Sequence, residues 1–461
     1  MQNTRRKRSF KFGDYKLIWP IIILLASLIL FSLLYSSKVN AKDLPQLTTN
    51  GKNIEKSGQV FKMQGVNFGG LFETERYLNN TPFGDWKTML DTNQNDADTW
   101  GKNFWNQDKD NGDLAKIKKL NVNTVRLPFT YMNLIDYSKY KSHLNDDSYT
   151  LNTSNLDDLW PKGGDKDAFS QLDNFIQKAE NQGLYVVLDL HGAFGSQNGQ
   201  EHSGQVVDNG QGQGLYGNSG NQKLTKQLWQ KIANHYKNSN LSSGIAGYDL
   251  LNEPNSQHDQ SDGSTSYTGP DQWSYYDQLL NAIRKTGDNH IAFIESVWSS
   301  GNLPNPSKYG NGKNGEHWYK NNVVYSYHEY LSSIDKNAEY SFWDQKYDDI
   351  NNAVKQGQGY DVPTYIGEFS VTGSGKYTPG VKEWQKVLND FNKNGYSWTV
   401  WNYRAKAGSG SNSNWGIYNE DDQHVSTGDT GYGEWSKFGS PQNLRKNDML
   451  AGVVSDNSTP N

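Results

Sequence analysis

Short apolar runs recur along this chain, and most of them are followed by a segment with the apolar period of a helix. The eight runs are KMQGVNF, NTVRLPF, LYVVLDLH, IAGYDLLNE, IAFIES, VVYSYHEY, PTYIGEF and YSWTVWNY, the first ending near Phe68 and the last near Trp401. Strands that alternate with helices predict a parallel sheet, and eight such units predict a closed (β/α)8 barrel, the TIM-barrel form of the α/β class. An open doubly wound sheet is the alternative.

The helices between these runs are expected where apolar residues fall on one face. The clearest stripe is Phe169, Leu172, Ile176 and Ala179, and Gly183 is expected to end this helix. Comparable stripes are Leu224, Leu228 and Ile232; Trp273, Tyr276, Leu280 and Ile283; Ile350 and Val354; and Val381, Trp384, Leu388 and Phe391. The helix between the fifth and sixth runs is poorly defined. Polar stretches over 92–113 and 135–152 predict enlarged loops after the first two strands.

The N-terminus combines a cluster of positive charge with a long apolar segment. Six basic residues within the first 16 positions precede an uncharged run from Leu17 to Tyr35. About 20 apolar residues suffice to span a bilayer, and the basic flank keeps the N-terminus inside. We therefore expect residues 1–41 to form a basic tail with a transmembrane signal-anchor or signal peptide, and residues 42–461 to form one exported domain, secreted or anchored at the cell surface. Cleavage after Ala41 stays open.

The composition restricts the partners of this exported domain. Aromatic residues make up 13% of the 461 residues, enough for a large core and for a groove that stacks flat polar ligands. The net charge is −5 without a basic patch beyond the N-terminus, which weighs against nucleic acid. The chain has no cysteine, so thiolate nucleophiles and thiolate metal sites are excluded. A monomer is favoured, although the sequence does not define the oligomeric state.

Polar side chains stand at or near the carboxyl ends of these apolar runs. They are Arg126, His191, Asn252, Glu253, His328, Tyr330, Glu368 and Trp401. In a parallel barrel the carboxyl ends of all strands converge on one mouth, whatever their separation in the sequence. One carboxylate at a strand end is ordinary turn chemistry. Two carboxylates with two histidines and an arginine at one rim indicate an active site.

Six short motifs, TVRLP, DLHG, LNEP, YHEY, GEF and WNY, occur in this order on the expected strands. In these motifs the chain resembles glycoside hydrolase family 5, a family of retaining (β/α)8 glycosidases. The segments GVNFGGLFETE and DLHGAFGSQNG are similar to its exo-β-1,3-glucanase branch. The resemblance covers most of the exported domain and implies hydrolysis of β-glucosidic bonds, with a β-glucan or β-glucoside as the substrate.

The resemblance assigns the reaction to two carboxyl groups. Glu253 matches the family's acid/base, which protonates the departing oxygen and then deprotonates the incoming water. Glu368 matches its nucleophile, which attacks the anomeric carbon and forms a glycosyl-enzyme ester. These roles require surroundings that push the two pKa values apart, so that one carboxyl group keeps its proton and the other stays charged.

Three further residues are expected to act close to the nucleophile. Arg126 and Tyr330 are suited to donate hydrogen bonds that keep Glu368 ionised. Asn252 can bond the sugar 2-hydroxyl, an interaction that strengthens in the transition state.

Four other residues are expected to hold the sugar. Glu75 matches a glutamate that helps to hold the terminal glucose, and Trp401 is expected to stack under the reacting ring. His191 and His328 are expected to contact sugar hydroxyls or to orient the glutamates, and a buried structural role is the alternative for His191.

The chain departs from the exo-β-1,3-glucanase branch on the side of the leaving group. Phe194 replaces a proline, while Gln200 and Ser333 replace aromatic residues. An endo-acting β-1,4- or β-1,6-glucanase therefore stays open, as does a glycan-binding surface protein without activity. No cofactor and no metal are expected, because the histidines lack metalloprotease spacing and the DKDNGD loop lacks the terminal glutamate of a calcium loop.

Overall fold

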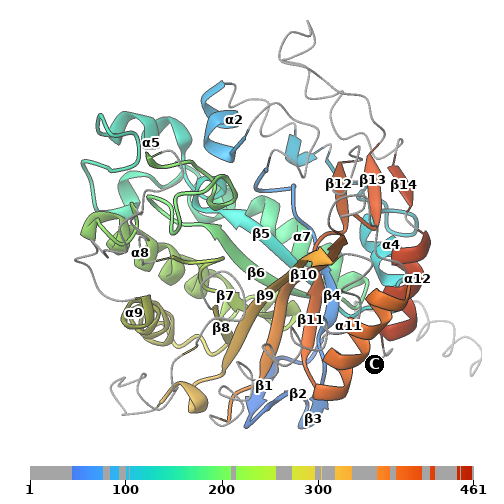
Figure 1. The fold of residues 1–461 in the computed structure, drawn as a ribbon. Coiled ribbons are helices and arrows are strands. Elements are labelled where there is room, and N and C mark those ends of the chain that lie inside the picture. Colours follow the sequence, from blue (N-terminus) through green and yellow to red (C-terminus); the bar gives the residue numbers. More distant parts are fainter. Residues whose placement is uncertain are drawn as a thin grey trace, which may run out of the picture. The chain divides into compact units, whose positions relative to one another are not determined.

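Eight parallel strands form a closed barrel at the centre of the molecule (Figure 1). In spatial order they are β10 (Thr364–Gly373), β11 (Ser397–Val400), β4 (Gln64–Asn67), β5 (Thr124–Thr130), β6 (Tyr185–Gly192), β7 (Ile245–Asp249), β8 (Ile291–Glu295) and β9 (Val323–Ile334). All eight apolar runs contribute one strand each, so the predicted closed barrel is confirmed and the open sheet is wrong.

The computed structural model describes residues 44–75, 84–92, 100–102, 104–208, 214–255, 272–295, 303, 317–334, 361–373, 381–406, 416–420, 444–446 and 448–458. Among these residues, no helix is long and apolar enough to cross a membrane. The predicted transmembrane segment at residues 17–35 and the predicted helix around Ile350 lie outside the described residues.

Amphipathic helices cover the outside of the barrel, as the stripes predict. They are α7 (Ser170–Asn181), α8 (Ser219–Tyr236), α9 (Gln272–Arg284) and α11 (Val381–Asn394). Gly183 follows α7 with φ +69°, a left-handed conformation that glycine adopts without steric cost. Two expected stripe residues differ: Trp273 is only partly buried and Val381 is 43% exposed, since both lie in the first turn of their helix.

The long connections after β4 and β5 contain short helices rather than open loops. They are α2 (Trp86–Thr92), α4 (Asp113–Lys118), η2 (Tyr131–Asn133), α5 (Tyr137–His143), η3 (Leu156–Asp158) and α6 (Asp165–Ala168). Shorter 3-10 turns elsewhere are η4 (Glu201–Ser203), η6 (Ser242–Gly244) and η8 (Trp318–Lys320). In α5, Asp136 caps the helix by accepting from the backbone N–H groups of Ser138 and Lys139.

A small antiparallel sheet precedes the barrel and was not anticipated. It consists of β1 (Leu47–Asn50), β2 (Asn53–Lys56) and β3 (Gln59–Phe61). Its turns pass through Gly51 and Gly58, both with positive φ, so the Asn-Gly and Ser-Gly pairs were the available signal. Leu47, Ile54 and Phe61 pack with residues from the amino ends of β6 to β10. This sheet therefore closes the amino end of the barrel.

The described part of the C-terminus adds a second sheet and a helix. They are β12 (Arg404–Lys406), β13 (Tyr418–Glu420), β14 (Leu444–Lys446) and α12 (Asp448–Asn457). The Nδ2 group of Asn392 in α11 donates to the carbonyl of Asn457, 2.8 Å away, which ties α12 to the barrel's helical layer.

Candidate active site

Glu253 and Glu368, 115 positions apart in the sequence, meet at the carboxyl end of the barrel. One carboxylate oxygen of each, together with a ring nitrogen of His328, lie within 4.8 Å of one another. Glu368 lies on β10, whereas Glu253 follows the end of β7. The Nδ1 atom of His328 is 2.9 Å from Glu253 Oε1 and 3.5 Å from Glu368 Oε2, so this imidazole bridges the two carboxylates.

The backbone at Glu253 is held in an unusual conformation that aims its carboxylate. Its φ is +42°, and a left-handed conformation costs a residue other than glycine roughly 1–3 kcal/mol. The Asn198 side chain donates from Nδ2 to the Glu253 carbonyl at 3.0 Å, and Gln197 donates to the preceding carbonyl of Asn252 at 2.8 Å. The loop after β6 thus stabilises the strained turn.

Two donors hold the carboxylate of Glu368. Arg126 donates from Nη1 to Oε1 at 2.5 Å, and the Tyr330 hydroxyl donates to Oε2 at 2.5 Å. Burial raises the pKa of Glu368, but the positive charges of His328 and Arg126 outweigh it and lower the pKa below its usual value. Glu368 is therefore ionised at neutral pH, as a nucleophile requires.

Arg126 is fully buried and serves several acceptors at once. It donates to Asp249 Oδ2 at 3.0 Å and to Asn252 Oδ1 at 2.9 Å, and lies 3.1 Å from Asp189 Oδ1. Burial alone would lower the pKa of this guanidinium, but Asp189, Asp249 and Glu368 raise it well above its usual value. Burial also raises the pKa of Asp189 and of Asp249 to about 7, against the effect of Arg126. Sequence analysis assigned no role to either aspartate.

The surroundings of Glu253 differ from expectation. His202 Nε2 lies 3.1 Å from Glu253 Oε2, and His328 Nδ1 lies 2.9 Å from Oε1. Burial raises the pKa of Glu253, but hydrogen bonds from the two histidines lower it well below its usual value. The prediction that the surroundings separate the two pKa values, with one carboxyl group kept protonated, is therefore wrong for the site without substrate. Both pKa values shift downward.

Two groups close to Glu253 have raised pKa values. Glu295, the last residue of β8, has Oε1 3.1 Å from Nε2 of His328. Burial raises the pKa of Glu295 well above its usual value, and Asp249 raises it further. Burial lowers the pKa of His202, but the bond to Glu253 outweighs it and raises the pKa. Contacts therefore run from Glu295 through His328 and Glu253 to His202, and the two end groups, Glu295 and His202, have raised pKa values. Neither Glu295 nor His202 was identified as a site residue, although the strand-end position of Glu295 was a usable signal.

The remaining predicted residues line the other side of the same site. His191 bonds Asp189 through Nδ1 at 2.6 Å, and its ring stacks on Trp401 with 5.6 Å between centroids and 7° between planes. Asn252 Nδ2 lies 3.4 Å from His191 Nε2. Burial lowers the pKa of His191 well below its usual value, so its ring is neutral.

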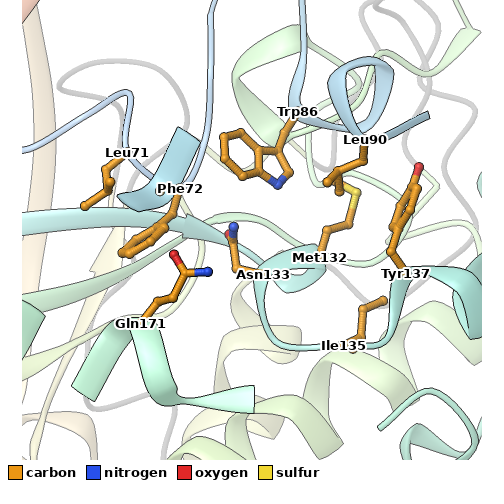
Figure 2. Close-up of a pocket in the computed structure, with 10 residues that line it drawn as sticks. Leu71, Phe72, Trp86, Leu90, Met132, Asn133, Ile135, Tyr137 and Gln171 are labelled. Atoms are coloured by element: carbon orange, nitrogen blue, oxygen red, sulfur yellow. The ribbon is translucent and has the colours of Figure 1, made fainter. Parts of the chain in front are cut away.

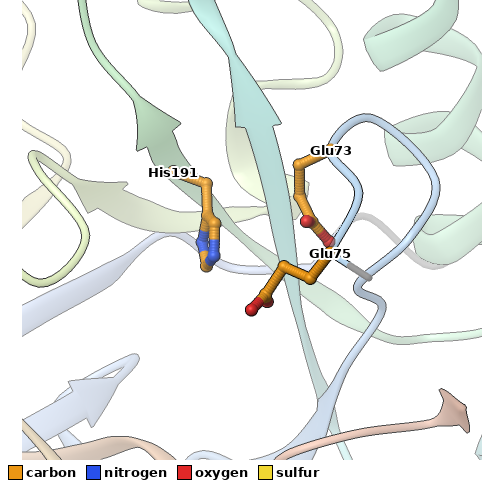
Figure 3. A group of neighbouring side chains, drawn as sticks. All are labelled: Glu73, Glu75 and His191. Atoms are coloured by element: carbon orange, nitrogen blue, oxygen red, sulfur yellow. The ribbon is translucent and has the colours of Figure 1, made fainter. Parts of the chain in front are cut away.

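Glu75 completes this side. One polar atom each of Glu73, Glu75 and His191 lie within 4.8 Å of one another, and Figure 3 shows the three side chains. A continuous set of contacts therefore joins all nine predicted site residues: Glu75, Arg126, His191, Asn252, Glu253, His328, Tyr330, Glu368 and Trp401.

Groups able to hold a cation are confined to this site within the described residues. They are Glu73, Glu75 and His191; Asp189, His191 and Glu368; and Glu253, His328 and Glu368. In the DKDNGD loop, by contrast, Asp108 accepts from the backbone N–H groups of Asp110 and Asn111, and Asp113 accepts from the Tyr403 hydroxyl. These bonds stabilise the turn and the start of α4.

A separate small pocket of about 90 Å³ lies beside α2 (Figure 2). Leu71, Phe72, Trp86, Leu90, Met132, Ile135 and Tyr137 line most of it, with Gly101, Asn133 and Gln171. None of the nine predicted residues lines this pocket, and it presents no ionised side chain for acid–base chemistry.

Comparison with known proteins relates this geometry to a family. The family model Cellulase (glycosyl hydrolase family 5) matches residues 79–407. A β-xylosidase of Phanerodontia chrysosporium is 25% identical over 379 residues, which cover 77% of this chain and 69% of that protein. A glucan 1,3-β-glucosidase of Candida oleophila is 30% identical over 238 residues, 48% of each chain. A probable glucan endo-1,6-β-glucosidase B of Aspergillus terreus is 25% identical over 393 residues, 78% of this chain and 85% of that protein.

The solved structures agree on the fold. The rutinosidase from Aspergillus niger superimposes with a TM-score of 0.56 at 14% sequence identity, covering 77% of this chain and 95% of that one. The predicted resemblance is confirmed by the family match, which covers more than half of the chain. This chain belongs to glycosyl hydrolase family 5.

Proposed function

We propose that this chain is a retaining β-glucan hydrolase in which Glu368 is the nucleophile and Glu253 is the acid/base. The observation that carries this proposal is the distance of at most 4.8 Å between an oxygen of each carboxylate. Retaining glycosidases place their two carboxyl groups about 5–5.5 Å apart, whereas inverting enzymes need about 6.5–9.5 Å to fit a water molecule between sugar and base. The short distance supports double displacement.

In the first step the ionised Glu368 attacks the anomeric carbon. The bond from that carbon to the glycosidic oxygen breaks, and its electron pair stays on the oxygen. The same oxygen receives a proton from Glu253. Arg126 and Tyr330 keep Glu368 ionised and fix its direction of attack. The product of this step is a glycosyl ester on Glu368.

In the second step water replaces the ester. Glu253, now ionised, takes a proton from a water molecule while the water oxygen attacks the anomeric carbon. The bond from that carbon to Glu368 breaks, and Glu368 leaves as a carboxylate. Glu253 must carry a proton before the first step, yet the free site favours its ionised form. His202 lies 3.1 Å from Glu253 Oε2, and because its pKa is raised it can return this proton as the sugar binds.

The proposed substrate is a β-glucan or β-glucoside, with a preference for terminal β-1,3-linked glucose. The name of the Candida oleophila relative supports the 1,3-linkage, and the position of Glu75 beside His191 supports a site that holds a terminal sugar. The Aspergillus terreus relative is named as an endo-1,6-glucosidase, so an endo-β-1,6-glucanase is the second candidate. Product sizing on laminarin, pustulan, lichenan and cellulose separates them: early release of glucose indicates exo action, and mixed oligosaccharides indicate endo action.

We also propose that residues 42–461 form the catalytic domain and that it acts outside the cytoplasm as a monomer. The support for action outside the cytoplasm is the basic and apolar N-terminal segment of the sequence. Fractionation of cells producing the full chain, with the N-terminus of the released protein determined, tests retention against cleavage after Ala41.

Trapping of the glycosyl-enzyme tests the mechanism directly. A 2-deoxy-2-fluoro-β-glucoside with a good leaving group should inactivate the enzyme and add one sugar mass to the peptide that contains Glu368. Labelling of another carboxylate, or release of the α-anomer as first product, would contradict the proposed roles.

A further inference from the structure

Glu73 is a buried carboxyl group that the proposed mechanism does not use. It lies on the loop after β4, two residues before Glu75, and is 0% exposed. Its Oε1 accepts from the backbone N–H of Gly70 at 2.6 Å. Its Oε2 is also buried and has no hydrogen-bond partner among the described residues. Leaving a buried polar group unsatisfied destabilises a fold, so this oxygen is better explained by a ligand than by folding.

The position of Glu73 identifies where that ligand lies. A polar atom of Glu73 lies within 4.8 Å of polar atoms of both Glu75 and His191 (Figure 3). A Cβ atom added at Gly69 would stand 3.2 Å from Glu73 Oε1 and 2.9 Å from the Trp401 ring. Glycine at position 69 thus keeps the Glu73 carboxyl group close to the indole on which the sugar is proposed to stack.

The protonation state of Glu73 favours a neutral ligand. Burial raises its pKa to about 8 against the opposing bond from Gly70, and the nearby Glu368 and Asp189 raise it further. At neutral pH the group is therefore mainly a carboxylic acid. Because Oε1 accepts from Gly70, the proton resides on Oε2, where it can be donated while the same oxygen accepts. Sugar hydroxyls have this mixed character, whereas a divalent cation requires ionised ligands.

We propose that Glu73 is a specificity-determining residue that binds, together with Glu75, a free hydroxyl of the sugar on the non-reducing side of the cleaved bond. This inference rests on the proposed function, since it takes the ligand to be the sugar bound over Glu368. The preferred glycone is a neutral hexosyl residue. A sugar that lacks this hydroxyl leaves the buried oxygen of Glu73 unpaired, and an anionic sugar is repelled by the surrounding carboxyl groups.

The test is a cycle of enzyme and substrate changes. The 3-, 4- and 6-deoxy analogues of an aryl β-glucoside are assayed with the wild type, Glu73→Leu and Glu73→Gln. In the wild type, removal of one particular hydroxyl is expected to lower kcat/KM by at least about 10-fold, because a site built around a hydroxyl rejects its absence. In Glu73→Leu the same removal is expected to cost less than about 3-fold, and Glu73→Gln is expected to be intermediate.

Two controls separate binding from folding. Glu180→Gln changes a buried carboxyl group at the far end of α7 and is expected to leave the deoxy pattern unchanged. Thermal unfolding of Glu73→Leu is expected at a somewhat lower temperature, because the Gly70 N–H loses its acceptor, whereas Glu73→Gln keeps an acceptor oxygen and is expected to unfold at the wild-type temperature.

Three outcomes would overturn the inference. One is an equal penalty for every deoxy substrate in the wild type and in Glu73→Leu. Another is calorimetric binding of Ca²⁺, Mn²⁺ or Zn²⁺ that Glu73→Leu abolishes without changing the deoxy pattern. Calorimetry with gluconolactone is run in parallel, so that Glu73 is tested even if no β-glucoside is hydrolysed and the proposed function fails. Affinity is expected to fall at least about 10-fold in Glu73→Leu, and equal affinity of the two proteins would reject the inference.

Discussion

At the amino end of the barrel, strands β1 to β3 cover a cluster of apolar side chains, while at the carboxyl end the same barrel strands carry charged groups packed against one another. Leu47, Ile54, Phe61 and Met63 pack against apolar residues from the starts of the strands. At the other end Arg126 lies among Asp189, Asp249, Glu295 and Glu368, all within 3.9 Å. The difference indicates that apolar packing at the amino end stabilises the fold, whereas the carboxyl end, which holds the candidate active site, contains buried charges that are costly to desolvate.

The largest expected effect is a loss of activity, with a much smaller loss of stability, when either candidate catalytic glutamate at the carboxyl end is replaced. Glu368→Gln and Glu253→Gln are each expected to lower kcat by at least about 10³-fold, because each removes a group that bonds with or exchanges a proton with the substrate. The free energy of unfolding is expected to fall by only about 1–3 kcal/mol, because the lowered pKa of each glutamate means that its charge stabilises the fold at neutral pH, while the amide keeps the shape of the side chain. Steady-state kinetics and urea unfolding measure the two quantities. Turnover near the wild-type rate in either variant would refute the assignment of roles.

Arg126→Met is expected to lower both stability and activity, although the residue lies at the carboxyl end of the barrel. Removal of the guanidinium leaves several buried carboxylates unpaired, and loss of one partner from such a group costs about 3–5 kcal/mol. Activity is expected to fall as well, because Arg126 no longer holds Glu368. Denaturant unfolding and kinetics on the folded fraction measure both losses. Wild-type stability of this variant would show that the surrounding carboxyl groups are protonated and are not stabilised by the charge of Arg126.

Phe61→Ala, at the amino end of the barrel, is expected to lower stability without lowering activity. The ring packs edge-on against Tyr185 with 5.3 Å between centroids, and its removal is expected to cost about 3–5 kcal/mol of unfolding free energy. The value of kcat/KM for folded enzyme is expected to stay at the wild-type level. Val60→Ala is the matched control, because Val60 is 61% exposed on the same strand and its change is expected to cost less than about 0.5 kcal/mol. A large loss of activity in folded Phe61→Ala would mean that the two ends are coupled.

His202→Asn is expected to have the smallest effect, on pH dependence. The bond from His202 lowers the pKa of Glu253, so its removal raises that pKa and moves the basic limb of the kcat/KM profile to higher pH. The stability effect has a defined window. The lowered pKa of Glu253 stabilises the fold above its ordinary value of 4.5, and the raised pKa of His202 stabilises it below its ordinary value of 6.5.

The variant should therefore lose most stability, on the order of 1 kcal/mol, between these two values. The difference should shrink at lower pH as Glu253 is protonated, and at higher pH as His202 loses its proton. Thermal unfolding of both proteins from pH 4 to pH 8 measures this window. A difference that stays constant across the range would show that the contact acts through packing and not through charge.

The sequence by itself determined the order and number of the barrel strands, and it brought forward nine candidate site residues. Apolar runs and helical stripes are local patterns, and in a parallel barrel every strand end reaches the same mouth. Predicting the residues at strand ends therefore required no knowledge of which strands are neighbours. The hairpins of β1 to β3 were also encoded locally, in Asn-Gly and Ser-Gly pairs, and were missed because no apolar run accompanied them.

Only the tertiary structure decided which charged groups face one another, and hence their protonation. Asp189 and Asp249 sit within buried strands and become neighbours through the register of β6 and β7. His202 reaches Glu253 from a turn 51 positions earlier, and Glu73 meets His191 across the mouth of the barrel. Because a buried pKa depends on distances between groups that are remote in the sequence, no local pattern could show that the candidate acid/base is ionised in the free site.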